Sequence, residues 1–216
     1  MEVSNVSRTT GRGFRRWMFN PVGGLTQLGR MILVGGLVAL ALPLLVMSPA
    51  HANFGSAVGG PWLANNKSHR VDYYDTLTKT GNMTQWALNN QFPRFDFTWT
   101  YVDGSDYDVR IMDGEYGDTP AYGWTDCPSS ATLGGTHPNR WCYGQVLRIN
   151  YALAAAWDTT WGRRALACHE LGHTVGLRHE DASDPSSSCM KTNTTPNNSL
   201  ANTYSAEDVN QVLANY

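Results

Sequence analysis

Residues 161–175 read WGRRALACHELGHTV, and the next four residues are GLRH. This stretch decides the fold, because its residue pattern fits a helix, whereas the segments before it alternate as strands do. Asp158 or Thr159 can cap the first turn of this helix, and Gly176 is placed to end it. His169 and His173 are four residues apart, so a helix directs both imidazoles to one face.

The same stretch carries a candidate metal site. His169 and His173 can bind one ion, and Gly176 permits a sharp turn that brings His179 back as a third nitrogen ligand. Glu170 then lies beside the metal rather than on it, where a general base belongs. Three imidazoles leave one position of a tetrahedral zinc open, as in catalytic sites. The alternative is a solvated helix with scattered histidines.

Upstream of this helix, short alternating segments predict strands. These segments are residues 70–74, 95–102, 108–112 and 144–151. Residues 84–90 fit one or two helical turns, and residues 114–135 read as a long loop. Downstream, residues 180–203 read as a loop before Ser205 opens a last short helix, with Asp208 as its capping-box partner. Strands and helices in this order predict an α+β domain.

The N-terminal region has the pattern of a secretory signal peptide. Five arginines and one acidic residue precede position 31, and residues 31–47 carry no charge. Ala50-His51-Ala52 then matches an A-x-A cleavage site. We therefore expect residues 1–52 to be removed after Ala52 and residues 53–216 to form a single secreted, extracellular domain. The alternative is an uncleaved membrane anchor.

Composition narrows the class of protein. The chain has 216 residues, of which 42% are hydrophobic, as in an ordinary globular protein. Removing the leader takes five of the 16 basic and one of the 18 acidic residues, which leaves 11 and 17. This acidic balance argues against binding to nucleic acid and to an anionic membrane surface.

Four cysteines lie in the expected mature part of the chain: Cys127, Cys142, Cys168 and Cys189. An exported chain with an even number of cysteines is expected to form disulfides. Four cysteines allow three pairings. The alternatives are buried thiols or zinc ligands, but no C-x-x-C spacing supports a zinc–thiolate site.

Residues 169–179, HELGHTVGLRH, match HExxHxxGxxH, and the chain in this region resembles the metzincin metalloproteases. The resemblance implies a small catalytic domain: a twisted, mostly parallel sheet of short strands, an active-site helix and a C-terminal helix. It implies one catalytic Zn²⁺ held by the three histidines, with Glu170 as general base for a zinc-bound water that hydrolyses peptide bonds. Met190 would form the Met-turn, a hydrophobic floor below the metal.

The resemblance also favours one set of disulfides. Cys168 directly precedes the first expected ligand, and Cys189 directly precedes Met190. A bridge between them would pin the Met-turn to the active-site helix and could stabilise the fold by about 3 kcal/mol. Cys127 and Cys142 would then form the second bridge.

For partners, the resemblance implies a protein or peptide substrate that pairs with an edge strand. We assign residues 108–112 to that strand, with the loop 114–135 as a wall, and expect a monomer. Thr192 stands where some members have a tyrosine ligand, so the chain looks closer to small matrixin-like or bacterial members. The rival hypotheses are a secreted zinc-containing binding module and a zinc hydrolase of a non-protein substrate.

Calcium is a further candidate cofactor. Five aspartates gather around the third expected strand: Asp103, Asp106, Asp108, Asp113 and Asp118. Carboxylate oxygens suit Ca²⁺, although the spacing is not that of an EF-hand. The remaining histidines of the mature chain, His69 and His137, lie in loop-like sequence and are expected at the surface.

Overall fold

The computed structural model describes residues 53–117, 119–192, 195–197 and 201–216. The expected signal peptide and its cleavage site at Ala52 lie outside the described residues. Within the described ranges, no helix is both long enough and apolar enough to cross a membrane.

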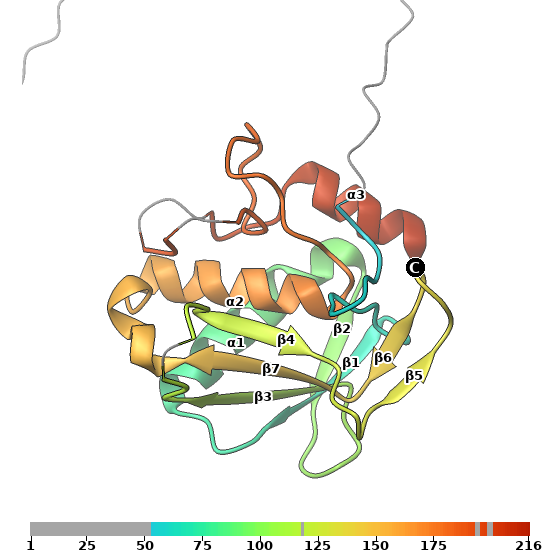
Figure 1. Cartoon of the computed structure of the whole chain (residues 1–216), viewed down its shortest axis with the longest axis horizontal. Helices are drawn as coiled ribbons and strands as arrows, with labels where there is room; N and C mark the ends of the chain where they lie inside the picture. The colour runs from blue at the N-terminus through green and yellow to red at the C-terminus, as the bar shows by residue number, and fades with distance from the viewer. Residues whose placement is uncertain (1–52, 118, 193–194, 198–200) are drawn as a thin grey trace, which may run out of the picture. The chain divides into compact units, whose positions relative to one another are not determined.

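The core of the fold is a five-stranded sheet in the order β2-β1-β3-β7-β4 (Figure 1). Its strands are β1 (Ser68–Tyr73), β2 (Thr98–Tyr101), β3 (Val109–Gly114), β4 (Gly123–Asp126) and β7 (Gln145–Asn150). Neighbouring strands are parallel except β4, which runs antiparallel to β7. The predicted α+β class with a mostly parallel sheet is confirmed.

Alternating side chains explain why one face of this sheet is covered. Ile111 of β3 lies beside Leu147 of β7, and both are fully buried. The intervening residues point to the opposite face, where Arg110 pairs with Asp72 and Arg148 pairs with Asp126. Two helices that pack on each other, α1 (Thr78–Asn90) and α2 (Thr160–Thr174), lie along the sheet in Figure 1.

The segment between β1 and β2 differs from the prediction. Helix α1 is longer than the expected turns at 84–90, and a 3-10 helix, η1 (Phe92–Phe95), follows it. The expected strand at 95–102 starts only at Thr98, because Asp96 has a left-handed backbone with φ of 59°. Phe92, Phe95 and Phe97 are instead buried together. Phe95 and Phe97 alternate as strand residues do, but Phe95 ends the 3-10 helix and the left-handed Asp96 separates it from Phe97.

The expected loop at 114–135 is also wrong in part. It contains β4 and β5 (Thr132–Gly134), and β5 pairs with β6 (Trp141–Tyr143) in a separate two-stranded sheet. Strand β3 is hydrogen-bonded to β1 on one side and β7 on the other. Residues 108–112 therefore offer no free edge, and the edge strands of the sheet are β2 and β4, of which β4 contacts α2.

The ends of the long helix and of the last helix follow the prediction. Gly162 donates its backbone N–H to the side chain of Thr159, which caps α2 at 3.0 Å. Gly176 has a φ of 91° and lies just beyond the other end. Before α2 lies the 3-10 helix η2 (Tyr151–Ala156), and α3 (Ala206–Asn215) begins with a capping box of Ser205 and Asp208.

Two disulfides cross-link the chain, in the expected pairing. Cys168–Cys189 joins α2 to the turn that holds Met190, and Cys127–Cys142 joins the segment after β4 to β6.

Candidate metal centre

Three histidines converge at the C-terminal end of α2. The Nε2 atoms of His169 and His173 are 3.2 Å apart, and the Nε2 atom of His179 lies 3.0 Å from the first and 3.1 Å from the second. Across the described ranges, this is the only cluster of His, Cys, Asp or Glu side chains close enough to hold an ion. The chain therefore brings together all three expected ligands.

Hydrogen bonds to the opposite ring nitrogens fix where the protons are. The Nδ1 atom of His169 donates to the carbonyl of Cys189 at 2.6 Å, and that of His173 donates to the carbonyl of Leu177 at 2.8 Å. Burial lowers the pKa of His169 to about 4 and that of His173 well below its ordinary value, so both rings are neutral near pH 7. Their Nε2 atoms hence carry lone pairs, which cannot hydrogen-bond to each other.

Such an arrangement of lone pairs fits a metal ion. Zinc binds imidazole nitrogen at about 2.0–2.1 Å, and tetrahedral geometry then separates the ligand nitrogens by about 3.3 Å. The observed separations of 3.0–3.2 Å are close to this value. Backbone carbonyls that accept from the other ring nitrogen are the usual support of metal-binding histidines.

The turn after α2 delivers the third histidine. Gly176 N–H donates back to the carbonyl of His173, and Leu177 N–H donates to that of Gly172. Gly176 needs its positive φ, and a Cβ atom there would also lie 3.2 Å from Leu63 and 3.3 Å from Phe54. The chain can therefore reverse tightly enough for His179 to face the helix.

Met190 lies directly under the helix. It is fully buried, and a Cβ atom at Gly172 would lie only 2.4 Å from its sulfur. Ser188 Oγ accepts the backbone N–H of Met190, and the carbonyl of Met190 accepts that of Glu180. The turn at Met190 is thus fixed below the histidine-bearing face of α2, the position that the resemblance implies for a Met-turn.

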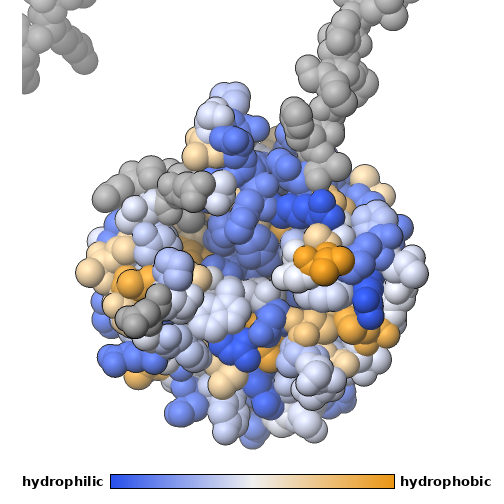
Figure 2. All heavy atoms as spheres, viewed as in Figure 1, coloured by the Kyte–Doolittle hydropathy of each residue, from blue (hydrophilic) through white to orange (hydrophobic). Residues whose placement is uncertain are grey.

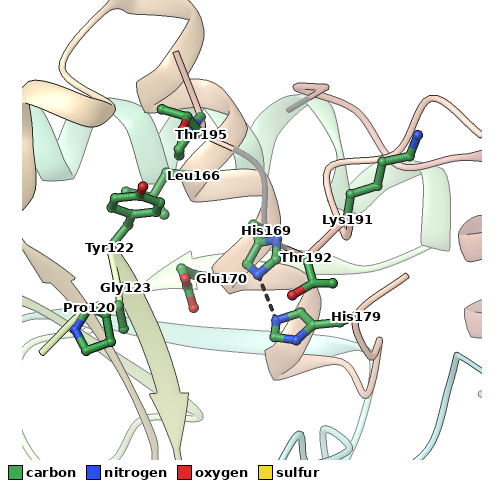
Figure 3. Close-up of a pocket in the computed structure, with 12 residues that line it drawn as sticks. Pro120, Tyr122, Gly123, Leu166, His169, Glu170, His179, Lys191, Thr192 and Thr195 are labelled. Carbon is green, nitrogen blue, oxygen red and sulfur yellow. Dashed lines mark hydrogen bonds between the residues drawn. The ribbon is translucent and has the colours of Figure 1, made fainter. Parts of the chain in front are cut away.

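Glu170 points into the space beside the histidines, next to Gly123 of β4 (Figure 3). It is 3% exposed, and its Oε2 atom has no hydrogen-bond partner. Burial raises the pKa of Glu170 to about 8. A Cβ atom at Gly123 would lie 2.9 Å from the Glu170 side chain, and Thr125 donates to the Glu170 carbonyl at 3.0 Å. Strand β4 therefore leaves room for this carboxyl group and holds its backbone.

Two adjoining cavities form a cleft beside the histidines. One cavity of about 430 Å³ and another of about 530 Å³ share His169, Glu170 and His179 in their walls. The first continues toward Tyr122 and Leu166. The second continues toward Trp124, Arg178 and the segment from Ala57 to Pro61. In Figure 2 most of the visible surface is hydrophilic, and apolar residues form separate patches.

Other expectations about candidate residues fare differently. His137 is exposed, as expected, but His69 is 1% exposed and lies within β1, so its assignment to the surface is wrong. Gly123 and Thr125 were missed because they fall in a segment that reads as loop. Four residues of strand are too few to give a clear alternation.

The aspartates do not form a calcium site in the described part of the chain. Asp106 pairs with Arg70, Asp108 accepts the backbone N–H of Arg70, and Asp113 accepts that of Leu77. Asp106 and Asp108 thus share the partner Arg70, Asp113 has another, and no three of these carboxylates converge among the residues that the structure describes. Asp118 lies outside the described residues.

Comparisons with known proteins add little to this geometry. Neither the family models nor the curated proteins include a match to the chain. Among solved structures, the structure of myroilysin is similar, with a TM-score of 0.45 and 11% sequence identity. That similarity covers 69% of this chain and 92% of the myroilysin chain.

Proposed function

We propose that this protein is a secreted zinc-dependent endopeptidase of the metzincin type. The observation that carries the proposal is the combination of three converging Nε2 atoms with the buried, unpartnered carboxyl of Glu170, where all four residues line the cavity of about 530 Å³. Neutral imidazole is a preferred ligand of zinc, and three such ligands leave a position open. A purely structural zinc site would have no use for this carboxyl group.

In the proposed reaction, Glu170 is the general base. The chemistry that a zinc ion supplies when bound is Lewis acidity, which polarises a carbonyl group and acidifies water. Oε2 of Glu170 accepts the proton of the attacking water and later delivers it to the leaving amine nitrogen. Gly123 and Thr125 keep the carboxyl in place, and burial excludes competing hydrogen bonds. A divalent cation nearby would oppose the rise in the pKa of Glu170 that burial causes.

The proposed substrate is an extended peptide that lies along β4. This strand pairs with β7 on one side, and its residues Gly123, Trp124 and Thr125 line the cleft. An extended chain can add to such an edge through main-chain hydrogen bonds, and the cavities on both sides can take side chains. We therefore assign to β4 the role expected of residues 108–112.

The compartment and assembly belong to the same proposal. Two disulfides suit an oxidising environment, in agreement with a leader that is cleaved after Ala52. We propose a monomer that binds neither nucleic acid nor, once the leader is removed, a membrane. The zinc ion is the one cofactor that the described residues are suited to hold.

The test is hydrolysis of casein and of quenched peptides by the full chain, expressed with its own leader and purified as the exported product. We expect one zinc per chain, chelator-sensitive cleavage and an N-terminus at Asn53. Glu170→Gln should retain zinc and lose activity by about 10²–10⁴-fold. The matched control is Glu115→Gln, because Glu115 is exposed and lies outside the cleft.

Each other outcome rejects part of the proposal. Bound zinc without cleavage of any peptide would favour a binding module or a hydrolase of a non-protein substrate. Activity that survives in Glu170→Gln would remove the general base. An absence of bound zinc would reject the central assignment, and an N-terminus upstream of residue 53 would favour the anchored form.

A further inference from the structure

The first residues of the described chain, Asn53–Ser56, lie against the turn that carries His179. We call these four residues the N-terminal clasp. Gly55 N–H donates to the carbonyl of Gly176 at 2.9 Å, and Arg178 N–H donates to that of Asn53 at 2.6 Å. Phe54 forms an antiparallel bridge with Leu177. The clasp thus follows the turn residue by residue, up to the position next to His179.

The side chain of Arg178 closes this contact. Its Nε atom donates to the carbonyl of Gly55 at 2.8 Å, and its Nη2 atom donates to that of Ser56 at 2.9 Å. A planar guanidinium can donate to two acceptors in one fixed geometry, which an ammonium group cannot do. Within the described ranges, no carboxylate pairs with Arg178. Both hydrogen bonds that its guanidinium donates in this part of the chain go to backbone carbonyls of the clasp.

The clasp is itself anchored at its other end. Ser56 is 1% exposed, and its N–H donates to the carbonyl of Pro138 at 2.6 Å. Its hydroxyl accepts the N–H of Arg140 at 2.9 Å and contacts the ring of His137 at the same distance. These partners lie between β5 and β6, in the hairpin that Cys127–Cys142 ties to the segment after β4. Hydrogen bonds therefore run without a break from this hairpin to Arg178.

From these contacts we infer that the N-terminal clasp holds the third zinc ligand in place, with Arg178 and Ser56 as positioning residues. The inference rests on the proposed zinc site and goes beyond it. His169 and His173 are oriented by α2 and by two carbonyls, whereas His179 follows a glycine turn and is exposed. Partners that orient a metal ligand set the metal affinity, and losing one weakens binding by about 10–100-fold.

The experiment measures zinc affinity by competition with a chromogenic chelator, in the full chain expressed with its leader. Arg178→Leu should bind zinc about 10–100-fold more weakly. Because Arg178 also lines the cavity beside Trp124, zinc affinity is the deciding measurement, and kcat and KM are not. Arg164→Leu is the matched control: this arginine lies on α2, contacts the ring of Trp86 and is remote from the clasp. Its zinc affinity should equal that of the wild type.

Arg178→Lys and Ser56→Ala keep the inference falsifiable if Arg178→Leu fails to fold. The lysine keeps the charge but loses the two-pronged contact, so zinc binding should again weaken. Thermal unfolding of the metal-free proteins separates stability from positioning. If the arginine and serine variants lose stability but keep wild-type zinc affinity, the clasp is only structural and the inference is wrong. If the wild type binds no zinc, the proposed function falls first, and the inference falls with it.

Discussion

The two sides of the metal centre are built in different ways. His169 and His173 face each other because four residues of helix separate them, and each is oriented by a carbonyl close to the site. His179 lies after a turn that is also held by Gly55 and Ser56, which are 123 and 122 positions away from Arg178 in the chain. One side is local in sequence, and the other adds contacts with the N-terminal clasp, which is more than 120 positions away.

This difference teaches where the site is vulnerable. A helix of 15 residues that packs on α1 keeps two ligands in register whenever the core is formed. The position of His179 depends also on contacts between two segments without regular secondary structure, which open more easily than a core helix does. Because a bound metal stabilises whichever state holds its ligands, zinc should in turn stabilise the docked clasp.

The largest expected effect comes from the disulfides, one on each side. They close loops of similar size, with sequence separations of 21 and 15, so each should contribute about 3 kcal/mol to the free energy of unfolding. Cys168 and Cys189 are both fully buried under α2, so the double alanine variant at this pair also leaves a cavity. We expect this variant to lose more stability than Cys127→Ala/Cys142→Ala, as measured by urea unfolding.

The same two variants also sharpen the comparison at the metal. The hairpin that Cys142 anchors supports the clasp, so loss of its disulfide should weaken zinc binding as Arg178→Lys does. Two results would contradict this account of how the two sides are supported. One is that Cys127→Ala/Cys142→Ala unfolds more easily than Cys168→Ala/Cys189→Ala. The other is that Cys127→Ala/Cys142→Ala binds zinc as tightly as the wild type does.

How far the sequence predicts this molecule follows from the same contrast. The helix, its Thr159 cap, the ending at Gly176 and the convergence of the histidines depend on spacing within a few residues, and the sequence pattern contains that information. Alternation predicts the strands β1, β3 and β7, whereas their mostly parallel arrangement is implied by the family resemblance. The disulfide pairing is different, because it came from the family resemblance and from the place of Cys168 and Cys189 beside the motif.

What the sequence could not predict depends on contacts between distant segments. Gly123 matters because the Glu170 side chain lies against it, and nothing near Gly123 in the chain indicates that. Strand β4 is an edge strand because it pairs with β7 on one side and, within the described ranges, with no strand on the other, and this pairing is a contact between distant segments. Arg178 reads as one more variable position of the motif until Gly55 and Ser56 are seen to accept its hydrogen bonds. The roles of such residues can be recognised only from the folded structure.

A smaller effect is expected at His69, which is buried where α2 ends. Its Nε2 atom lies 3.2 Å from the hydroxyl of Thr174, and its ring packs on Phe92 and Phe97. Burial lowers the pKa of His69 to about 3, from 6.5 in the unfolded chain. Above pH 6.5 the His69 ring is neutral in both the folded and the unfolded state, so it adds no pH dependence to the free energy of unfolding. As the pH falls from 6.5 toward 3, only the unfolded state gains the proton, so stability falls, by about 2 kcal/mol at pH 5.

The measurement is urea unfolding of the wild type and of His69→Gln between pH 7 and pH 4. The three clustered histidines and the carboxylates titrate in both proteins, so the difference between the two curves isolates His69. The wild type should lose about 2 kcal/mol more than His69→Gln on going from pH 7 to pH 5. An NMR titration of the folded wild type that places the pKa of His69 near 6.5 would contradict the assignment.

The smallest expected effect compares two tyrosines that contact the two sides of the site. The hydroxyl of Tyr204 donates to the carbonyl of Cys168 in α2 at 2.7 Å. The hydroxyl of Tyr216 accepts the N–H of Ala64 at 2.7 Å and donates to the carbonyl of Val175 at 3.2 Å, beside the glycine turn. Replacing either by phenylalanine should cost about 1 kcal/mol in urea unfolding.

The two phenylalanine variants should differ in zinc affinity, although they cost similar stability. Tyr204→Phe leaves α2 intact, and a helix keeps its own register, so zinc binding should stay at the wild-type value. Tyr216→Phe releases Ala64, whose neighbour Leu63 packs on Gly176, and so loosens the turn before His179. If Tyr204→Phe weakened zinc binding and Tyr216→Phe did not, the helix side would be the more sensitive one and the contrast between the two sides would be wrong.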